Sequence, residues 1–491
     1  MNLFRSLSSN CGDQMLFDPF EHLAAKFVGI ATSLVPEYMT SLIFASPLSA
    51  RSPDNCMLWH SNYRNHRKLK ILITLLGSVV INSIKGIVKS IFHFKQFGYA
   101  LYGNINDTLL VVPSVMGKET PDGEYKTPYV FTGKDDGIFV FGSADSFNGE
   151  VQRVPKLKLK DKVIIQSLLI KSGINAFFIL KGNLFEKVLL LLEWLSWVLS
   201  LQWIYIYYLE KYLSEVVVNY KIRNVGCIHE MHYYARIVWR VVSKYNATSF
   251  TVQHATISDG KRWYFTYPEE KKSGLILPNV MYVYNEKVIQ LLRPYFENTK
   301  FLLGCSCRYS FWKETKEAKD TTKRKYFLFV GALAQFDNDV LIASIRNLLS
   351  TTKKIIPIRL RLHPTAKVSN SGKYWIHSKM KKGIIEISKN TPLKTDIEGA
   401  IAVVGMSTTV LEEALLMGCP VIQLTHPDYL PYIDIDGVPG AVKIDYRKLS
   451  VTNLLNLSNI QVDSESIRKS LGLNHRVVDY KQLFQRHKNL F

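Results

Sequence analysis

Short apolar runs alternate with amphipathic helical stretches from about residue 221 onward, and this alternation limits the fold more than any other feature. Strands that alternate with helices are joined by βαβ crossovers into parallel sheets, so the pattern predicts an α/β fold. The expected strands cover residues 225–229, 248–253, 280–284, 326–330, 356–362, 383–387, 402–404 and 420–424, and the expected helices cover residues 233–245, 286–295, 339–349 and 409–417.

A polar segment divides this pattern into two series. After Trp312, residues 313–325 contain only charged residues, threonine and one alanine, so they cannot fill a core, and residues 312–325 are expected to form a linker. We therefore predict two Rossmann-like, doubly wound domains facing a cleft, with extra helices in the N-terminal half. The expected boundaries are 1–311 for the N-terminal domain, 326–450 for the C-terminal domain and 451–491 for a helical tail that packs back on the N-terminal domain.

Two segments of the first half are apolar enough to raise the question of a membrane. Residues 71–84 carry no charge but number only 14, fewer than the roughly 20 that span a bilayer. Residues 188–209 carry one charge, Glu193, which lies with three other polar residues on one stripe of a helix. The stripe favours a buried or surface-lying helix over a span. Basic residues flank the apolar segments, which suits an anionic membrane surface or a solvated face: Arg64, Arg67, Lys68, Lys70, Lys156, Lys158, Lys160 and Lys162.

The net charge of +21 favours anionic partners such as nucleotides, phospholipid head groups or nucleic acid. The basic residues are spread along the whole chain without an RRM, helix-turn-helix or zinc pattern, so no nucleic-acid partner is expected. The six cysteines include no CxxC pair and the N-terminus lacks a continuous apolar core, so we expect a reducing cytoplasm and no signal peptide. A non-catalytic protein that binds an anionic polymer or lipid remains an alternative.

A basic pair closes the expected strand at residues 356–362. Alternation places Arg361 and His363 on the same face, and Pro364 ends the strand so that both side chains project at its tip. A guanidinium beside an imidazole can clamp a phosphate or diphosphate. The alternative is an arginine paired with a carboxylate and a histidine that caps a helix.

Hydroxyl residues follow the strand predicted at 402–404 and open the helix that comes after it. Ser407, Thr408 and Thr409 can add donors to the free N–H groups of the helix start, which is what holding a phosphate without a metal requires. Plain N-capping is the alternative. Glu413 is the candidate for the ribose hydroxyls of a nucleotide, whereas its neighbour Glu412 is expected to face solvent.

Histidines end two strands of the first series. His254 follows the strand at 248–253 and can act as a general base, and Glu230 can orient or replace it. A structural histidine is the alternative for His254. We predict no metal site, because the HExH string at 229–232 lacks the spacing of HExxH and the two Asp-X-Asp strings fit a helix cap and a loop: Asp337 with Asp339, and Asp434 with Asp436.

The residues from 396 to 424 (DIEGAIAVVGMSTTVLEEALLMGCPVIQL), together with RLHP at 361–364, resemble the C-terminal domain of GT-B glycosyltransferases. The likeness is greatest to bacterial enzymes of capsule and surface polysaccharides, including those that use CMP-activated sialic acid or Kdo. It implies that His363-Pro364 and Ser407-Thr408 hold the donor phosphate. The string STTVLEEA is similar to the ribose-contacting segment of UDP-N-acetylglucosamine 2-epimerases, which matches Glu413.

Gln253-His254 resembles the QHG element of surface-carbohydrate enzymes and of CDP-glycerol glycerophosphotransferases, which implies that His254 is the base. Ala255 stands where that element has glycine. The resemblance covers residues 225–442 and leaves residues 1–220 unmatched.

The resemblance implies a metal-independent glycosyltransferase without a cofactor that moves a sugar from a nucleotide-sugar donor, with CMP-sugar favoured, to a hydroxyl of a bacterial surface polysaccharide. The expected acceptor is a glycan or lipid-linked glycan, bound on the N-terminal side. The expected location is the cytoplasm, in peripheral contact with the inner membrane. A CDP-polyol phosphotransferase of the teichoic-acid type is the alternative enzyme.

Overall fold

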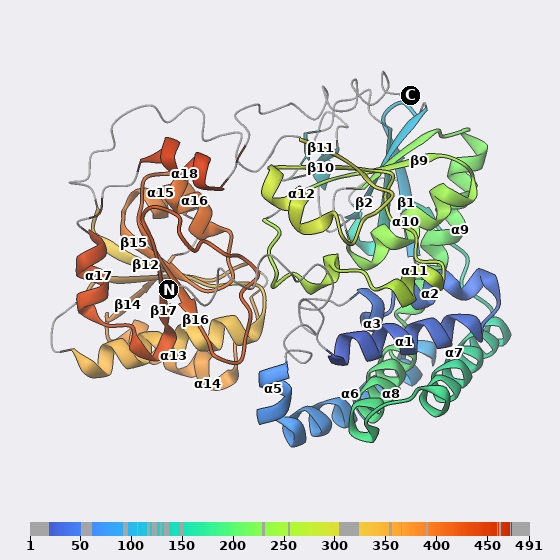
Figure 1. The fold of residues 1–491 in the computed structure, drawn as a ribbon, viewed down its shortest axis with the longest axis horizontal. Coiled ribbons are helices and arrows are strands. Elements are labelled where there is room, and N and C mark those ends of the chain that lie inside the picture. The colour runs from blue at the N-terminus through green and yellow to red at the C-terminus, as the bar shows by residue number, and fades with distance from the viewer. Residues whose placement is uncertain are drawn as a thin grey trace.

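The computed structural model describes residues 19–50, 61–91, 97–105, 107–114, 118–119, 125–127, 130–131, 137–147, 151–227, 231–253, 256–303, 324–352, 356–364, 366–388, 391–458, 460, 463–471 and 473. These residues form two α/β bodies that lie side by side (Figure 1). The expected linker at 312–325 falls largely outside the described residues, so the domain boundaries stay a prediction.

The N-terminal body is built on an eight-stranded sheet. Its strand order is β11-β10-β9-β8-β2-β6-β1-β7, and all neighbours are parallel except β1, which runs antiparallel to both β6 and β7. The strands are β1 (Phe97–Tyr102), β2 (Thr108–Pro113), β6 (Gly137–Ser143), β7 (Gln152–Arg153), β8 (Asn224–Cys227), β9 (Thr248–Val252), β10 (Val280–Val283) and β11 (Lys300–Leu303). A separate small sheet joins β3 (Lys118–Glu119), β4 (Tyr125–Thr127) and β5 (Val130–Phe131).

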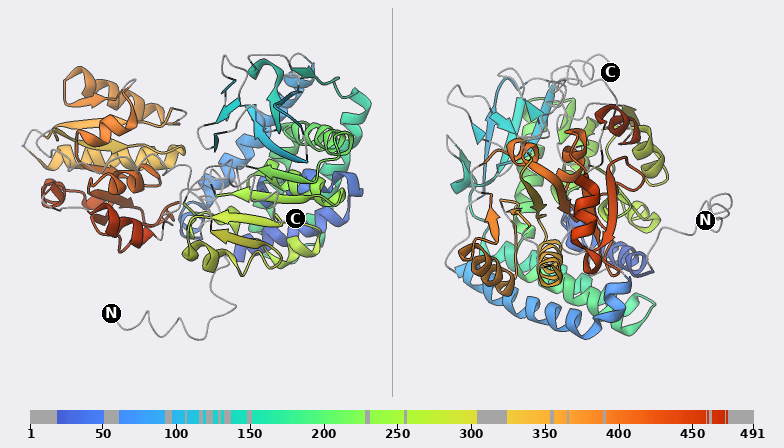
Figure 2. Two further views of the ribbon diagram at one scale, coloured as in Figure 1. Left: turned by 90° about the horizontal axis from the view of Figure 1, so that it is seen from above. Right: turned by 90° about the vertical axis from the view of Figure 1, so that its left-hand side faces the viewer.

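Helices cover this sheet and form a layer beyond it. Three of them, α6, α8 and α7, lie along the lower edge of the N-terminal body in Figure 1 and in the right-hand view of Figure 2. The helices are α1 (Pro19–Ser33), α2 (Thr40–Phe44), α3 (Pro47–Ala50), α5 (Ser61–His66), α6 (Lys68–Ile91), α7 (Leu159–Ile179), α8 (Leu184–Leu199), α9 (Trp203–Asn219), α10 (Tyr233–Lys244), α11 (Pro268–Lys272) and α12 (Glu286–Leu292).

The C-terminal body is a six-stranded parallel sheet in the order β14-β13-β12-β15-β16-β17. Successive residues of β12 join different apolar clusters, Phe327 and Phe329 one and Leu328 and Val330 the other, so both faces are covered. The elements are β12 (Tyr326–Val330), α13 (Gln335–Thr351), β13 (Ile358–Arg361), α14 (Asn370–Lys381), β14 (Ile385–Ile387), α15 (Leu393–Glu398), β15 (Ala400–Gly405), α16 (Val410–Leu416), β16 (Val421–Thr425), β17 (Ala441–Asp445), α17 (Val451–Ser458) and α18 (Ser464–Leu471).

The two parallel sheets confirm the α/β, doubly wound fold class. Every strand predicted in the second half is present within a few residues of its expected bounds, and the strand predicted at 326–330 matches β12. The helix expected at 286–295 ends earlier, at Leu292. The first half differs most, since β1, β2, β6 and β7 contribute four strands to the N-terminal sheet in a part of the chain where the sequence singled out extra helices but no strand.

The apolar segment at 188–209 folds into parts of α8 and α9, which are separated by a turn in which Leu201 adopts a positive φ of 58°. Trp194 and Trp203 are fully buried, and Glu193 is buried as well. The segment therefore packs inside the protein, as its polar stripe predicts. The helices whose length and composition would suffice to cross a membrane are instead Lys68–Gly86 and Leu159–Ile179, among the residues described.

The C-terminal tail is described only in part, because residues 474–491 of the predicted helical tail lie outside the described residues. The preceding helix α18 packs on α16 of the C-terminal body, with Ile467 buried in the same apolar cluster as Leu415. One hydrogen bond ties its end to the other body, since Asn285 Nδ2 donates to the carbonyl of Leu471 at 2.8 Å.

Candidate functional site

The loops that follow the carboxyl ends of the strands meet where the two bodies touch. Ser258, in the loop after β9, donates from Oγ to the carbonyl of Tyr432 at 2.7 Å, and the rings of Trp263 and Tyr432 pack edge to face at 5.4 Å. The bodies also approach closely at Gly260, where an added Cβ would lie 2.0 Å from the carbonyl oxygen of Pro431. We call this set of contacts the seam. Ligands of doubly wound sheets bind at such strand ends.

The strand order of the C-terminal sheet reverses direction between β12 and β15, which makes the loops after these strands the expected ligand site. The two strands lie very close there, because a Cβ on Gly405 would lie 2.9 Å from Cγ2 of Val330. The loop after β12 is held by the fully buried Asn338, which accepts from the backbone N–H of Ala332 at 2.9 Å and donates to its carbonyl at 2.9 Å. These two loops are therefore rigidly placed.

Ser407 links the loop after β15 to the seam. Its Oγ accepts a hydrogen bond from the backbone N–H of Tyr432 at 3.2 Å, and the carbonyl of Tyr432 in turn accepts from Ser258 of the N-terminal body. Ser407, a predicted phosphate-binding residue, is thus hydrogen-bonded to a residue that itself contacts the other body. A ligand held by this loop would sit where both bodies can reach it.

A buried carboxyl group lies beside Ser407. Asp337, in the first turn of α13, is 2% exposed, and neither of its carboxylate oxygens makes a hydrogen bond of normal geometry to a described residue. Burial raises the pKa of Asp337 from 3.8 to about 7, and the neighbouring Ser407 hydroxyl only partly opposes this rise. Asp337 is therefore neutral in a large fraction of molecules near neutral pH, so it can lie beside an anion with little repulsion.

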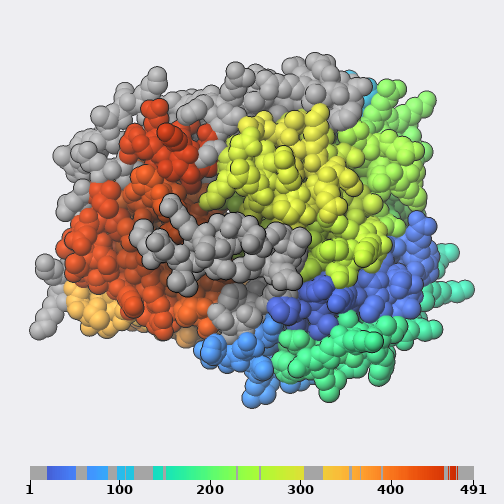
Figure 3. Space-filling model, viewed as in Figure 1, coloured from blue at the N-terminus to red at the C-terminus, as the bar shows by residue number. Residues whose placement is uncertain are grey.

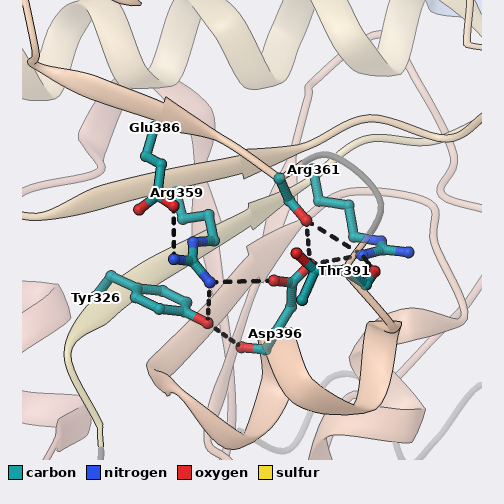
Figure 4. Close-up of polar contacts among 7 residues, drawn as sticks. Tyr326, Arg359, Arg361, Glu386, Thr391 and Asp396 are labelled. Atoms are coloured by element: carbon teal, nitrogen blue, oxygen red, sulfur yellow. Dashed lines mark hydrogen bonds and ion pairs between the residues drawn. The ribbon is translucent and has the colours of Figure 1, made fainter.

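Arg361 ends β13, as predicted, but its guanidinium is already occupied by a carboxylate. Figure 4 shows Nη1 of Arg361 contacting the buried Asp396 of α15 at 2.6 Å, as well as the carbonyl of Thr391 at 2.6 Å. Arg359 contacts the other oxygen of Asp396 at 3.2 Å and Glu386 at 2.6 Å. The ion pair is the alternative given above for Arg361, and it explains the position of this side chain without a phosphate.

The other predicted donor-binding residues are spread over two loops. His363 is exposed just beyond β13, whereas Ser407, Thr408 and Thr409 follow β15, and β12 lies between these two strands. At about 4.8 Å per strand, Arg361 and Ser407 start roughly 10 Å apart, a span that a diphosphate or a nucleotide sugar can bridge. Thr408 weakly caps the helix, since Oγ1 accepts from Val410 N at 3.4 Å.

The two glutamates of α16 behave differently from what the sequence suggests. Glu412 was expected to face solvent, but it is 1% exposed and accepts a hydrogen bond from the hydroxyl of Thr256 in the N-terminal body. That expectation is wrong, because α16 turns its first-turn carboxylate toward the seam. Glu413, the candidate for the ribose, is also buried, at the start of a helix of only seven residues. Its role stays a prediction.

The predicted catalytic pair, His254 and Glu230, lies outside the described residues. The described residues on either side of position 254 lie at the carboxyl end of β9. Gln253 is buried and accepts from the backbone N–H of Tyr284 at 2.9 Å, and Thr256 donates to Glu412 across the seam. The roles of His254 and Glu230 stay predictions.

Among the residues that the structure describes, no three side chains of His, Cys, Asp or Glu lie together as a metal site would need. The carboxylates of one Asp-X-Asp string contact a lysine, with Lys443 Nζ at 2.6 Å from Asp434 and 3.7 Å from Asp436. In the other string Asp339 accepts from the hydroxyl of Ser369, the N-cap residue of α14, at 2.7 Å, while Asp337 is buried.

Sequence reasoning did not single out Asp337, Tyr432 or Ser258 as site residues. The sequence does carry a local signal for Asp337. This residue lies in the first turn of the helix that follows the strand at 326–330 and a loop that contains a glycine. The role of Tyr432 has no such signal. Its partners are 25 and 174 residues away in the chain, so only the folded arrangement shows it.

No protein-family model matches the chain, and no curated protein is detectably similar to it in sequence. Similar solved structures include S. aureus MnaA with UDP (TM-score 0.39, 12% identity, 58% of this chain and 79% of that chain). Others are the UDP-GlcNAc 2-epimerase of Methanocaldococcus jannaschii with UDP-GlcNAc and UDP (0.37, 15%, 58% and 80%) and a glycosyltransferase from Rickettsia africae (0.36, 13%, 58% and 79%). The identities and TM-scores are low, so the fold assignment rests on the strand order and direction described above.

Proposed function

We propose that the protein is a glycosyltransferase that moves a sugar from a nucleotide-activated donor to an acceptor hydroxyl at the seam. The observation that carries the proposal is the meeting of two parallel, doubly wound sheets through the loops at their strand ends, by way of Ser258, Tyr432 and Ser407. A transfer between two substrates needs such a place, because each body can hold one of them.

In this proposal the donor lies on the C-terminal body. The loop at Ser407–Thr409 and the exposed His363 hold the phosphate, and Glu413 holds the ribose. These contacts stabilise the leaving nucleotide phosphate as negative charge develops on it. Asp337 keeps the floor of this loop free of charge while it is protonated. Arg361 retains its predicted phosphate contact only if the bound donor competes with Asp396 for its guanidinium.

His254 would deprotonate the acceptor hydroxyl in the same proposal, with Glu230 orienting it. The favoured donor is a CMP-sugar, and the favoured acceptor is a growing bacterial surface glycan, either free or lipid-linked. We place the reaction, without a metal or cofactor, at the cytoplasmic face of the inner membrane. These finer points rest on the resemblance of residues 225–442 and on the basic charge of the chain.

Thermal unfolding with free CMP, CDP, UDP and GDP tests donor binding. A nucleotide at 100 times its dissociation constant stabilises the folded state by about 2.7 kcal/mol, which is easily measured. We expect one nucleotide, CMP by preference, to raise the unfolding temperature. His363→Ala should reduce this shift, whereas the exposed control Glu398→Gln should retain it.

Turnover is tested separately with the matching sugar donors and CDP-glycerol. His254→Ala should leave the nucleotide shift intact and abolish transfer. Equal loss of nucleotide binding in His363→Ala and His254→Ala would contradict the division of roles. If none of the four nucleotides raised the unfolding temperature, the proposal would be overturned. Transfer from CDP-glycerol but from none of the sugar donors would favour the polyol phosphotransferase.

A further inference from the structure

Two helices of the N-terminal body present an apolar face that none of the described residues covers. We call it the α6–α7 face and define it by Leu69, Ile73 and Val80 of α6 and Leu159, Val163 and Phe178 of α7. These side chains are 54–74% exposed. Both helices flank α8 along one edge of the molecule (Figure 3), where they appear in blue and green. Large exposed apolar side chains gathered on two neighbouring helices in this way mark an interaction site.

The orientation of α6 is fixed by its opposite side. Ile71 and Leu75 are buried there, and Asn82 Nδ2 donates to Ser196 Oγ of α8 at 2.7 Å. The backbones come so close that a Cβ on Gly86 would lie 2.2 Å from the carbonyl oxygen of Leu199. The apolar side chains therefore cannot turn inward without breaking this packing.

The hydroxyl groups of α6 are satisfied within the helix. Thr74 donates to the carbonyl of Lys70 at 2.8 Å, Ser78 to the carbonyl of Thr74 at 2.8 Å, and Ser83 to the carbonyl of Val79 at 2.7 Å. A hydroxyl that is bonded to its own helix costs little when it enters an apolar medium. The face is thus compatible with contact to hydrocarbon.

Basic residues border the N-terminal end of each of these two helices. The exposed lysines at the starts of the two helices are Lys68 and Lys70 for α6 and Lys156, Lys158 and Lys160 for α7, and the described sequence of α6 contains no acidic residue. Their charges are crowded: burial lowers the pKa of Lys162, and the positive charge of Lys156 lowers it further. An anionic surface would relieve this repulsion.

We propose that the α6–α7 face lies flat on an anionic lipid bilayer, with its apolar side chains in the interface and its lysines against the head groups. An apolar helix face with a basic border is the pattern of interfacial membrane binding. Flat binding fits the structure better than spanning, because each helix packs along α8 and leaves only one side uncovered.

Vesicle flotation of the full-length protein tests the proposal. We expect binding to vesicles of phosphatidylcholine mixed with phosphatidylglycerol, weaker binding to phosphatidylcholine alone, and a loss of binding at high salt. Lys156→Gln and Lys160→Gln should each weaken binding to the anionic vesicles by about fivefold. Ile73→Ser combined with Phe178→Ser should weaken it on the order of tenfold or more.

Matched controls lie on the C-terminal body, where Tyr374→Ser removes a side chain that is 78% exposed and Lys381→Gln removes an exposed lysine. Both should bind vesicles as the unchanged protein does, and thermal unfolding checks that every variant is folded. Equal binding by folded face variants and controls would overturn the proposal. The proposal would also be overturned if the protein did not bind vesicles but formed a dimer that the substitution Ile73→Ser dissociates. It would be overturned as well if membrane-bound protein resisted extraction by alkaline carbonate, as a spanning protein does. Nucleotide shifts are measured on the same samples, so failure of the proposed function is seen separately.

Discussion

Replacing the buried Asp337 by asparagine should stabilise the protein, and increasingly so as the pH rises. The pKa of this carboxyl is raised by burial from 3.8 to about 7. The folded state therefore binds more protons than the unfolded state between these two values, and stability is lost as the pH rises through this window. At about 1.4 kcal/mol per pH unit, ionised Asp337 costs about 4 kcal/mol at alkaline pH.

Asparagine has nearly the same shape and carries no charge, so Asp337→Asn removes this pH dependence. We expect the variant to exceed the unchanged protein in stability by about 1 kcal/mol at pH 4.5 and by about 4 kcal/mol at pH 8.5. For a domain of this size each kcal/mol shifts the unfolding temperature by roughly 2–4 °C. Thermal unfolding at several pH values between these limits measures the trend.

The exposed Glu398, at the end of α15, provides the matched control. Glu398→Gln removes the same charge from the surface and should show no such dependence on pH. If Asp337→Asn gave a stability difference that did not change with pH, or destabilised the protein at pH 8.5, the ionised carboxylate would have a partner and our reasoning would be refuted.

Three further changes test the seam and the candidate site. Gly260→Ala places a Cβ against the carbonyl of Pro431 and should lower the free energy of unfolding by about 1–3 kcal/mol. The control Gly77→Ala on α6 adds a Cβ that meets nothing within 4 Å, so it should be neutral or stabilising. Thermal unfolding compares the two variants. Thr256→Val removes the hydrogen bond to the buried Glu412 and should cost about 1–3 kcal/mol, while Glu412→Gln keeps an acceptor and should cost less; equal costs would contradict the contact. Arg361→Gln leaves the buried Asp396 with weaker partners and should lower the free energy of unfolding by roughly 1–3 kcal/mol, an amount that the partial exposure of the guanidinium reduces. If the variant lost nucleotide binding without losing stability, Arg361 would instead be a phosphate ligand.

The elements of the second half were predictable because their signal is local. A strand such as β12 is a short apolar run, and a helix such as α10 has its own period, so each can be recognised without knowledge of its neighbours. The strands at 97–143 were missed because they lie among apolar helices and loops in a part of the chain where the alternation is irregular. Their place in the sheet depends on β2, which pairs with β8 more than 100 residues later in the chain (Thr108 opposite Asn224).

The candidate site was predictable only as a set of strand ends. The sequence places Arg361 and Ser407 after strands, but it does not show that Asp396 occupies Arg361 or that Tyr432 and Ser258 join Ser407 to the other body. These partners come from distant segments, so the choice between a phosphate ligand and an ion pair is made by packing.

The alternation of apolar strands and helices by itself determined the α/β fold class and the positions at which polar side chains leave the strands, because both follow from short-range periodicity. Only the tertiary structure decided which apolar surfaces are covered. The apolar segment at 188–209 is enclosed by neighbouring helices, whereas α6 and α7 keep an uncovered face. It also decided that Asp337 is buried while the nearby Asp339 accepts a hydrogen bond from the N-cap residue of α14, since burial depends on which parts of the chain meet and hydropathy does not record this.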